Sequence, residues 1–194
     1  MSPTQSATVL AVLGVVVLAA MLAGWRHRVT RSVAVVPELL PAPAADDPAL
    51  GAALTAPIDA TYVSTTRASD WLDRVAAHGL GARSGAVVRV YDAGVLIERT
   101  GAPDLYLPAA TVRAVGTSAG IAGKVVGHDG LIVLTWQAPG SAGVPGIELT
   151  TGLRLRHAAD RPLLIEAAGA LAGPAPEAHL TRADDLGAGT EGAQ

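Results

Sequence analysis

The chain has 194 residues, of which 50% are hydrophobic, with a mean hydropathy of +0.39 and a formal net charge of −3. It contains no cysteine, which excludes disulfides, thiolate metal sites and cysteine nucleophiles. Residues 59–172 hold ten acidic and ten basic residues, and such a balanced surface is a poor match for a phosphate backbone, so we expect no nucleic-acid partner. The length accommodates one ordinary domain and a targeting segment.

Residues 7–25, from Ala7 to Trp25, contain no charged side chain and predict a transmembrane helix, about 28 Å long at 1.5 Å per residue. Arg26, Arg28 and Arg31 follow this run, whereas residues 1–6 have no Lys or Arg. A cleaved signal peptide carries its positive charges before the apolar core, so this order favours an uncleaved anchor. The asymmetry also predicts a single-pass plasma (inner) membrane protein with residues 1–6 outside and the domain in the cytoplasm.

Residues 26–58 predict a basic juxtamembrane segment followed by a tether. Residues 37–57 read PELLPAPAADDPALGAALTAP, a proline- and alanine-rich composition typical of a semi-extended linker. Residues 59–172 form the predicted domain. The acidic, glycine-rich residues 173–194 predict a disordered tail.

The predicted domain begins with a β-prone stretch at residues 61–66. A short helix is then expected from Ser69 or Asp70 to about His78, because Trp71, Leu72 and Val75 recur at helical spacing. An aromatic side chain on an apolar helix face is usually buried, so this pattern predicts that Trp71 belongs to the core.

From Ser84 onward the period becomes two, which predicts strands. Residues 84–91 and 95–99 should pair across a turn at 92–94, with short strands at 105–107 and 112–114 and a glycine-rich turn at 116–120. Residues 122–127 should pair with 131–137 across the Asp-Gly turn. Residues 147–156 alternate strictly, which indicates one buried and one wet face.

The last predicted element is a helix. Asp160 should cap it, Pro162 should lie in its first turn, and its apolar face should contain Leu163, Leu164, Ala167, Ala168 and Leu171. The fold class expected from these elements is mainly β: a small barrel or sandwich with a C-terminal capping helix, preceded by one transmembrane helix.

Four stretches of the chain resemble the bacterial, actinobacterial-type pleckstrin-homology-like (PH-like) membrane proteins. They are TYVSTTRASDWLDRVAAHGLGARS at 61–84, GVLIERTGAPDLYLP at 94–108, GKVVGHDGLIVLTW at 123–136 and TTGLRLR at 150–156. The resemblance covers about half of the chain and implies one amino-terminal span with a PH-like domain. Such proteins are sometimes labelled transporters, but one span cannot form a transport path.

The motif most suggestive of catalysis is GTSAG at residues 116–120, which matches the G-x-S-x-G nucleophile elbow with Ser118 as nucleophile and Asp129 and His157 following in order. An elbow needs a strand, a sharp turn and a helix within a parallel sheet, and the residues after Ser118 do not predict that context. The spacing before Lys124 also fails the phosphate-loop pattern. No histidine spacing indicates a metal, so we expect no catalytic residue, cofactor or metal.

What remains is a binding function. The resemblance suggests basic residues as ligand contacts, and the candidates are Arg83, Arg89, Arg99, Arg113 and Lys124. Because these residues do not form a run, the interpretation favours a non-enzymatic binding or scaffolding module with a protein partner, at a sheet edge for example. The alternatives are a lipid or small-ligand sensor and a membrane-anchored serine hydrolase that uses Ser118.

Overall fold

The computed structural model describes residues 10, 12–24, 36–125, 130–140, 143 and 145–172, without the side chains of 124 and 125. Residues 12–24 are helical and expose their apolar side chains. Within the described residues no helix has both the length and the apolar character needed to cross a membrane. The expected span at 7–25 lies partly outside the described residues. The expected external tail 1–6, the arginine cluster at 26–31, Asp129 and the tail 173–194 lie wholly outside them.

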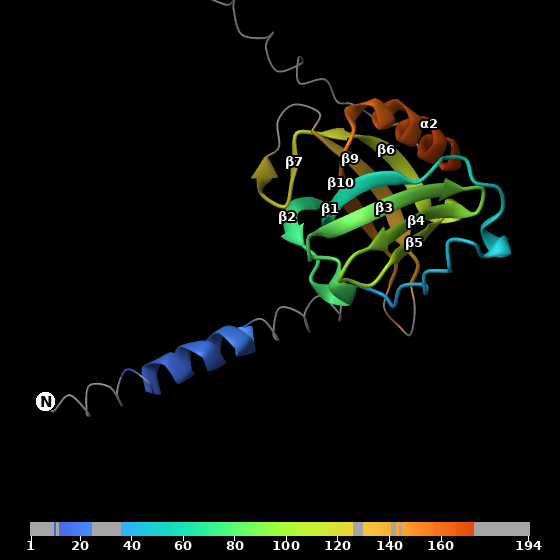
Figure 1. Cartoon of the computed structure of the whole chain (residues 1–194). Helices are drawn as coiled ribbons and strands as arrows, with labels where there is room; N and C mark the ends of the chain where they lie inside the picture. The colour runs from blue at the N-terminus through green and yellow to red at the C-terminus, as the bar shows by residue number, and fades with distance from the viewer. Residues whose placement is uncertain are drawn as a thin grey trace, which may run out of the picture.

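The core of the fold is an eight-stranded antiparallel sheet that curls around a hydrophobic interior (Figure 1). Its order is β5-β4-β3-β1-β10-β9-β6, with β2 pairing to β1. The bounds are β1 (Ile58–Arg67), β2 (Asp70–Arg74), β3 (Ser84–Tyr91), β4 (Gly94–Arg99), β5 (Leu105–Pro108), β6 (Val112–Ser118), β9 (Leu131–Ala138) and β10 (Ile147–Leu155). The prediction of a mainly β domain is therefore confirmed.

Helix α2 (Arg161–Leu171) lies across the curled sheet and contacts β6, β3 and β4 (Figure 1). Leu164 and Ala168 are fully buried against the core, which confirms the C-terminal helix, whereas Leu163 is largely exposed. Asp160 occupies the N-cap position, but its side chain makes no capping hydrogen bond. A 3₁₀ turn at Ala158–Asp160 directly precedes α2, so the backbone of Asp160 already has helical geometry.

The predicted helix over residues 69–78 is wrong. Residues 68–69 turn the chain back, and β2 pairs with β1 through Thr66 and Arg74. A 3₁₀ turn at Ala77–Gly79 follows. Because β2 lies at the sheet margin, Trp71 and Leu72 are 55% and 57% exposed instead of buried. A pattern of three apolar residues at helical spacing was too short to outweigh pairing with an available strand edge.

The predicted pairing of 122–127 with 131–137 is also wrong. Strand β9 pairs with β6 and β10, and the tiny strands β7 (Gly120–Ile121) and β8 (Lys124–Val125) pair with each other. Ala122 and Gly123 form their turn, both at positive φ. The predicted turn at 116–120 is largely strand, because β6 continues through Gly116 to Ser118 along β9.

Part of the expected tether packs onto the sheet. Val36 is 2% exposed and joins the main core, and Leu50 is 1% exposed and contacts Tyr91 and Leu96. The 3₁₀ turn Pro48–Leu50 is capped by the Asp47 carboxylate, which accepts from the Ala49 amide at 2.9 Å. We call residues 36–57 the strap. The strap contains no strand or α-helix, but its few apolar side chains still pack against apolar partners.

Candidate functional site

The outward face of the sheet is covered in two separate places. At one place the strap lies over β3, β4 and β5, where the Tyr91 hydroxyl donates to the Ala45 carbonyl at 2.7 Å. At the other place the β7–β8 hairpin folds back over the sheet, and Ile121 packs with Val63 and Leu131. The Ala122 amide holds this hairpin to β2 by donating to the Trp71 carbonyl at 2.9 Å.

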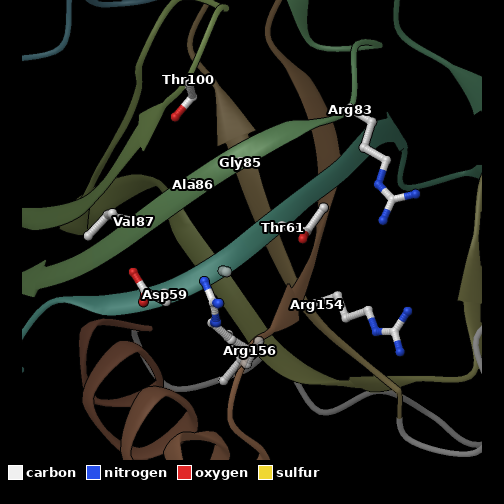
Figure 2. A pocket seen from close by; sticks show the side chains of 11 residues that line it. Asp59, Thr61, Arg83, Gly85, Ala86, Val87, Thr100, Arg154 and Arg156 are labelled. Carbon is white, nitrogen blue, oxygen red and sulfur yellow. The ribbon is translucent and has the colours of Figure 1, made fainter.

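Another part of this face, on β3, β1 and β10, contains an open hollow of about 560 Å³ (Figure 2). Its lining combines arginines, threonine hydroxyls, one carboxylate and small residues. The lining residues are Asp59, Ala60, Thr61, Arg83, Gly85, Ala86, Val87, Thr100, Arg154, Leu155 and Arg156.

The strand register explains why these side chains meet. Thr61 on β1 pairs with Gly85 on β3 and with Arg154 on β10, so the three form one row across the sheet. The row continues to Thr100, whose amide donates to the Gly85 carbonyl at 3.0 Å. Because Gly85 has no side chain, the middle of the row is open and becomes the floor of the hollow.

A second row lies two residues further along each strand. Asp59 pairs with Val87, and the Arg156 amide donates to the Asp59 carbonyl at 2.9 Å. Side chains at alternate positions of a strand share a face, so Asp59 and Arg156 lie on the same side of the sheet as Thr61 and Arg154. Figure 2 shows the Asp59 carboxylate and the Arg156 guanidinium near the same stretch of β1.

The three arginines of the hollow are exposed and have no ion-pair partner within the part of the chain that the structure describes. The contrast with other arginines is clear: Arg67 pairs with Asp73 at 3.0 Å and Arg89 with Glu98 at 2.8 Å. Three guanidinium groups against the single carboxylate of Asp59 leave this lining with a net charge of +2. The hollow is therefore suited to an anion.

Of the five predicted contact residues, the structure brings only Arg83 to this hollow. Arg89 lies on the outward face of β3 but is engaged by Glu98, whose hydrogen bond raises the pKa of Arg89. Arg113 on β6 is exposed and donates to the Ala110 carbonyl at 3.3 Å. The side chain of Lys124 lies outside the described residues.

Arg99 has a structural role instead of the predicted binding role. It is 6% exposed, its guanidinium lies 3.8 Å from the centroid of the Tyr62 ring, and burial lowers its pKa. It donates hydrogen bonds to the Ala82 carbonyl at 2.8 Å, to the Gly79 carbonyl at 3.0 Å and more weakly to the Pro103 carbonyl at 3.3 Å. Arg99 thus holds together the loops on either side of it.

Arg154 and Arg156 are the residues that sequence reasoning missed. The alternation of residues 147–156 already indicated that both arginines face solvent. The missing information was that β10 lies beside β1, and β1 beside β3, so that Arg83, about 70 positions earlier in the sequence, shares their hollow.

The candidate nucleophile Ser118 ends β6, an antiparallel strand, and is followed by the short strand β7 instead of a helix. Its hydroxyl is engaged locally, donating to the Gly120 carbonyl at 2.8 Å. His157 follows β10 and is exposed, and Asp129 lies outside the described residues. The strand–turn–helix context of a nucleophile elbow is thus lacking around Ser118. Across the described ranges, no three His, Cys, Asp or Glu side chains are grouped to hold a metal.

The curled antiparallel sheet, its C-terminal helix and a polar hollow on the outward face define a small, mainly β domain. The family described as "Bacterial PH domain-like" matches residues 36–169, more than half of the chain, and the protein belongs to this family. The match begins at Val36, where the strap first packs into the core. No curated protein matches the sequence.

Proposed function

We propose that this protein is a non-enzymatic, membrane-tethered binding module, with the outward face of β3, β1 and β10 as its binding surface. The observation that supports this most directly is the hollow whose three arginines form no ion pair within the described chain and outnumber its single carboxylate, Asp59. Guanidinium groups remain protonated in proteins, so they bind and orient anions without exchanging protons. Such a surface is suited to recognition.

Residues 7–25 are the proposed membrane anchor. Their lack of charge supports this, as do the exposed Val and Leu side chains of the helical residues 12–24. Ten residues, 26–35, separate this segment from Val36, the first residue packed into the domain. A fully extended chain of that length reaches at most about 36 Å. The domain therefore works close to the membrane surface, on the cytoplasmic side by the positive-inside rule.

The partner that we propose is a protein that covers the outward face. A photo-crosslinking residue at Thr61, in the floor of the hollow, should capture it in cells that make the full-length chain. The matched control carries the same residue at Glu166, which is exposed on α2 away from the hollow. We expect one stoichiometric protein adduct at position 61 and none at 166. Equal capture at both positions would contradict a specific surface.

The proposed topology has its own test. In cells stripped of the layers outside the plasma membrane, a protease added to the medium should leave the domain uncut. After the plasma membrane is disrupted, the protease should cut the connection at 26–35. Deletion of residues 7–25 should move the protein from the membrane fraction to the soluble fraction. Digestion of the domain before the plasma membrane is disrupted would contradict the proposed orientation. Unchanged fractionation after the deletion would contradict the proposed anchor.

The second candidate is a sensor of a lipid or small ligand. The positive charge of the hollow favours an anionic ligand over an uncharged one. Its signature is a ligand-dependent rise in the melting temperature of the full-length protein, since a ligand that binds only the folded state stabilises it.

A further inference from the structure

We propose that Arg83 and Arg154, with the Thr61 hydroxyl between their strands, form a binding site for a phosphomonoester group. This inference rests on the proposed function in its second form, a sensor of a lipid or small ligand, because it names the chemistry of a ligand for the same surface. The source of the group is either a soluble phosphomonoester or a lipid whose headgroup is one. The site lies over the outward face of β1 and β10, and Arg83 reaches it from the position directly before β3.

Charge selects the class of ligand. Asp59 offsets one of the three guanidinium groups, and Arg156 is the arginine that shares its row. Arg83 and Arg154 remain, with two positive charges that no carboxylate of the described chain neutralises. A phosphomonoester carries close to two negative charges at neutral pH, whereas a carboxylate or a phosphodiester carries one. The phosphomonoester therefore matches the charge of the site.

Geometry supports the same class. Arg83 precedes β3 and Arg154 lies on β10, so the two guanidinium groups approach from opposite sides of β1. In Figure 2 both extend to the same side of Thr61. Each guanidinium can offer two parallel N–H donors to a pair of phosphate oxygens, and the Thr61 hydroxyl can offer one more. Because Gly85, the β3 partner of Thr61, has no side chain, the ligand has space beside the Thr61 hydroxyl.

Arg83 and Arg154 differ from three other arginines of the domain, whose guanidinium groups already have partners within the protein. Arg67 and Arg89 have carboxylate partners and Arg99 is bound to backbone carbonyls. Like charges gathered on one face of a sheet are destabilising by themselves. An anion bound between Arg83 and Arg154 removes that repulsion, so ligand binding should also stabilise the fold.

The test uses the full-length protein in a mild detergent. Isothermal titration calorimetry measures binding of sn-glycerol 3-phosphate as the soluble phosphomonoester. Phosphatidic acid, a lipid phosphomonoester, and phosphatidylglycerol, a phosphodiester, are then compared in mixed micelles. The variants are Arg83→Gln, Arg154→Gln and their combination. Arg113→Gln is the matched control, because Arg113 is an exposed arginine outside the hollow.

We expect each single variant to weaken binding by about tenfold or more, since charge-assisted hydrogen bonds contribute on that scale, and Arg113→Gln to change little. Binding of sn-glycerol 3-phosphate identifies a soluble source, whereas binding of phosphatidic acid alone identifies a lipid headgroup. Equal binding of phosphatidic acid and phosphatidylglycerol, or equal losses in Arg113→Gln, would overturn the site in favour of diffuse charge attraction.

If neither phosphomonoester binds, the crosslink at Thr61 separates the two proposals. A protein adduct at that position without any phosphomonoester binding would overturn this inference and leave the proposed function standing. Absence of both would refute the two proposals together.

Discussion

Tyr62 illustrates how a polar side chain becomes part of this core. It is fully buried, and its hydroxyl donates to the Leu80 carbonyl at 2.8 Å and lies 2.6 Å from the Thr65 hydroxyl. Thr65 continues the chain of hydrogen bonds to Thr151, which accepts from the Trp136 indole at 3.0 Å. The side-chain polar atoms of these four residues are therefore hydrogen-bonded to one another or to the Leu80 carbonyl, as buried polar groups need to be.

Burial raises the pKa of Tyr62 to about 12, and this predicts alkaline instability. Above pH 10 the tyrosine of the unfolded chain loses its proton, whereas the folded protein keeps it until about pH 12, so rising pH favours unfolding. The free energy of unfolding should fall by about 3 kcal/mol over that interval through this group. Urea unfolding at several pH values measures the decrease.

The reference for this measurement is Tyr62→Phe. It lowers stability at neutral pH because the Leu80 carbonyl keeps only the Thr65 amide as a donor and the buried Thr65 hydroxyl loses its contact with Tyr62, but it should have a shallower decline above pH 10. Tyr91 and Tyr106 remain in both proteins and cancel in the comparison. Parallel declines of the two proteins would show that Tyr62 ionises as readily in the folded state as in the unfolded one.

At the scale of elements, the β7–β8 hairpin depends on one glycine of β10. An added Cβ at Gly152 would lie 2.9 Å from Cγ2 and 3.1 Å from Cδ1 of Ile121, which covers that position. The absence of a side chain at Gly152 thus allows Ile121 to pack closely onto β10. The two residues are 31 positions apart, so neither reveals the other in the sequence.

Gly152→Ala should therefore destabilise the protein by about 1–3 kcal/mol, because the new methyl group overpacks the contact with Ile121. In an Ile121→Ala background the clashing atoms are absent, and the same change should cost much less. A double-mutant cycle from urea unfolding measures this coupling. Additive losses would mean that the hairpin moves away freely and that the contact has no energetic weight.

At the scale of the whole molecule, the strap belongs to the folded unit. Besides Val36 and Leu50 in apolar clusters, the Leu54 amide donates to the Val90 carbonyl at 2.8 Å and the Thr55 hydroxyl accepts from the Val90 amide at 3.1 Å. The family match also begins at residue 36. The domain is therefore held to the proposed anchor by a connection much shorter than the expected tether of 26–58.

Two fragments test this boundary. Residues 36–172 should unfold cooperatively, whereas residues 59–172 should be less stable by several kcal/mol, since loss of Leu50 alone removes a buried leucine worth about 2–5 kcal/mol. Circular dichroism during urea unfolding compares them. The single change Leu50→Ala is the milder variant if the shorter fragment does not fold. Equal stability of both fragments would show that residues 36–58 add nothing to the folded unit, in agreement with a tether that ends at residue 58.

Much of the fold was predictable because its signals are local. The alternation along residues 84–91 and 147–156 and the amphipathic pattern of 161–171 depend on neighbouring residues alone, and the structure confirms all three elements. The predictions failed where the structure of a segment depends on which strand it pairs with. Residues 70–74 pair with β1 instead of forming a helix, and β8 pairs with β7 instead of β9. A short segment has no pattern strong enough to specify its partner.

The candidate site follows the same division. The sequence by itself determined that Arg154 and Arg156 face solvent, that the chain has no thiol chemistry and that a charge-free segment precedes the domain. Only the tertiary structure decided that Arg83 joins the two arginines of β10, that Arg99 is buried and that the strap covers Tyr91. The physical reason is that strand order brings together residues far apart in sequence, and periodicity carries no information about strand order.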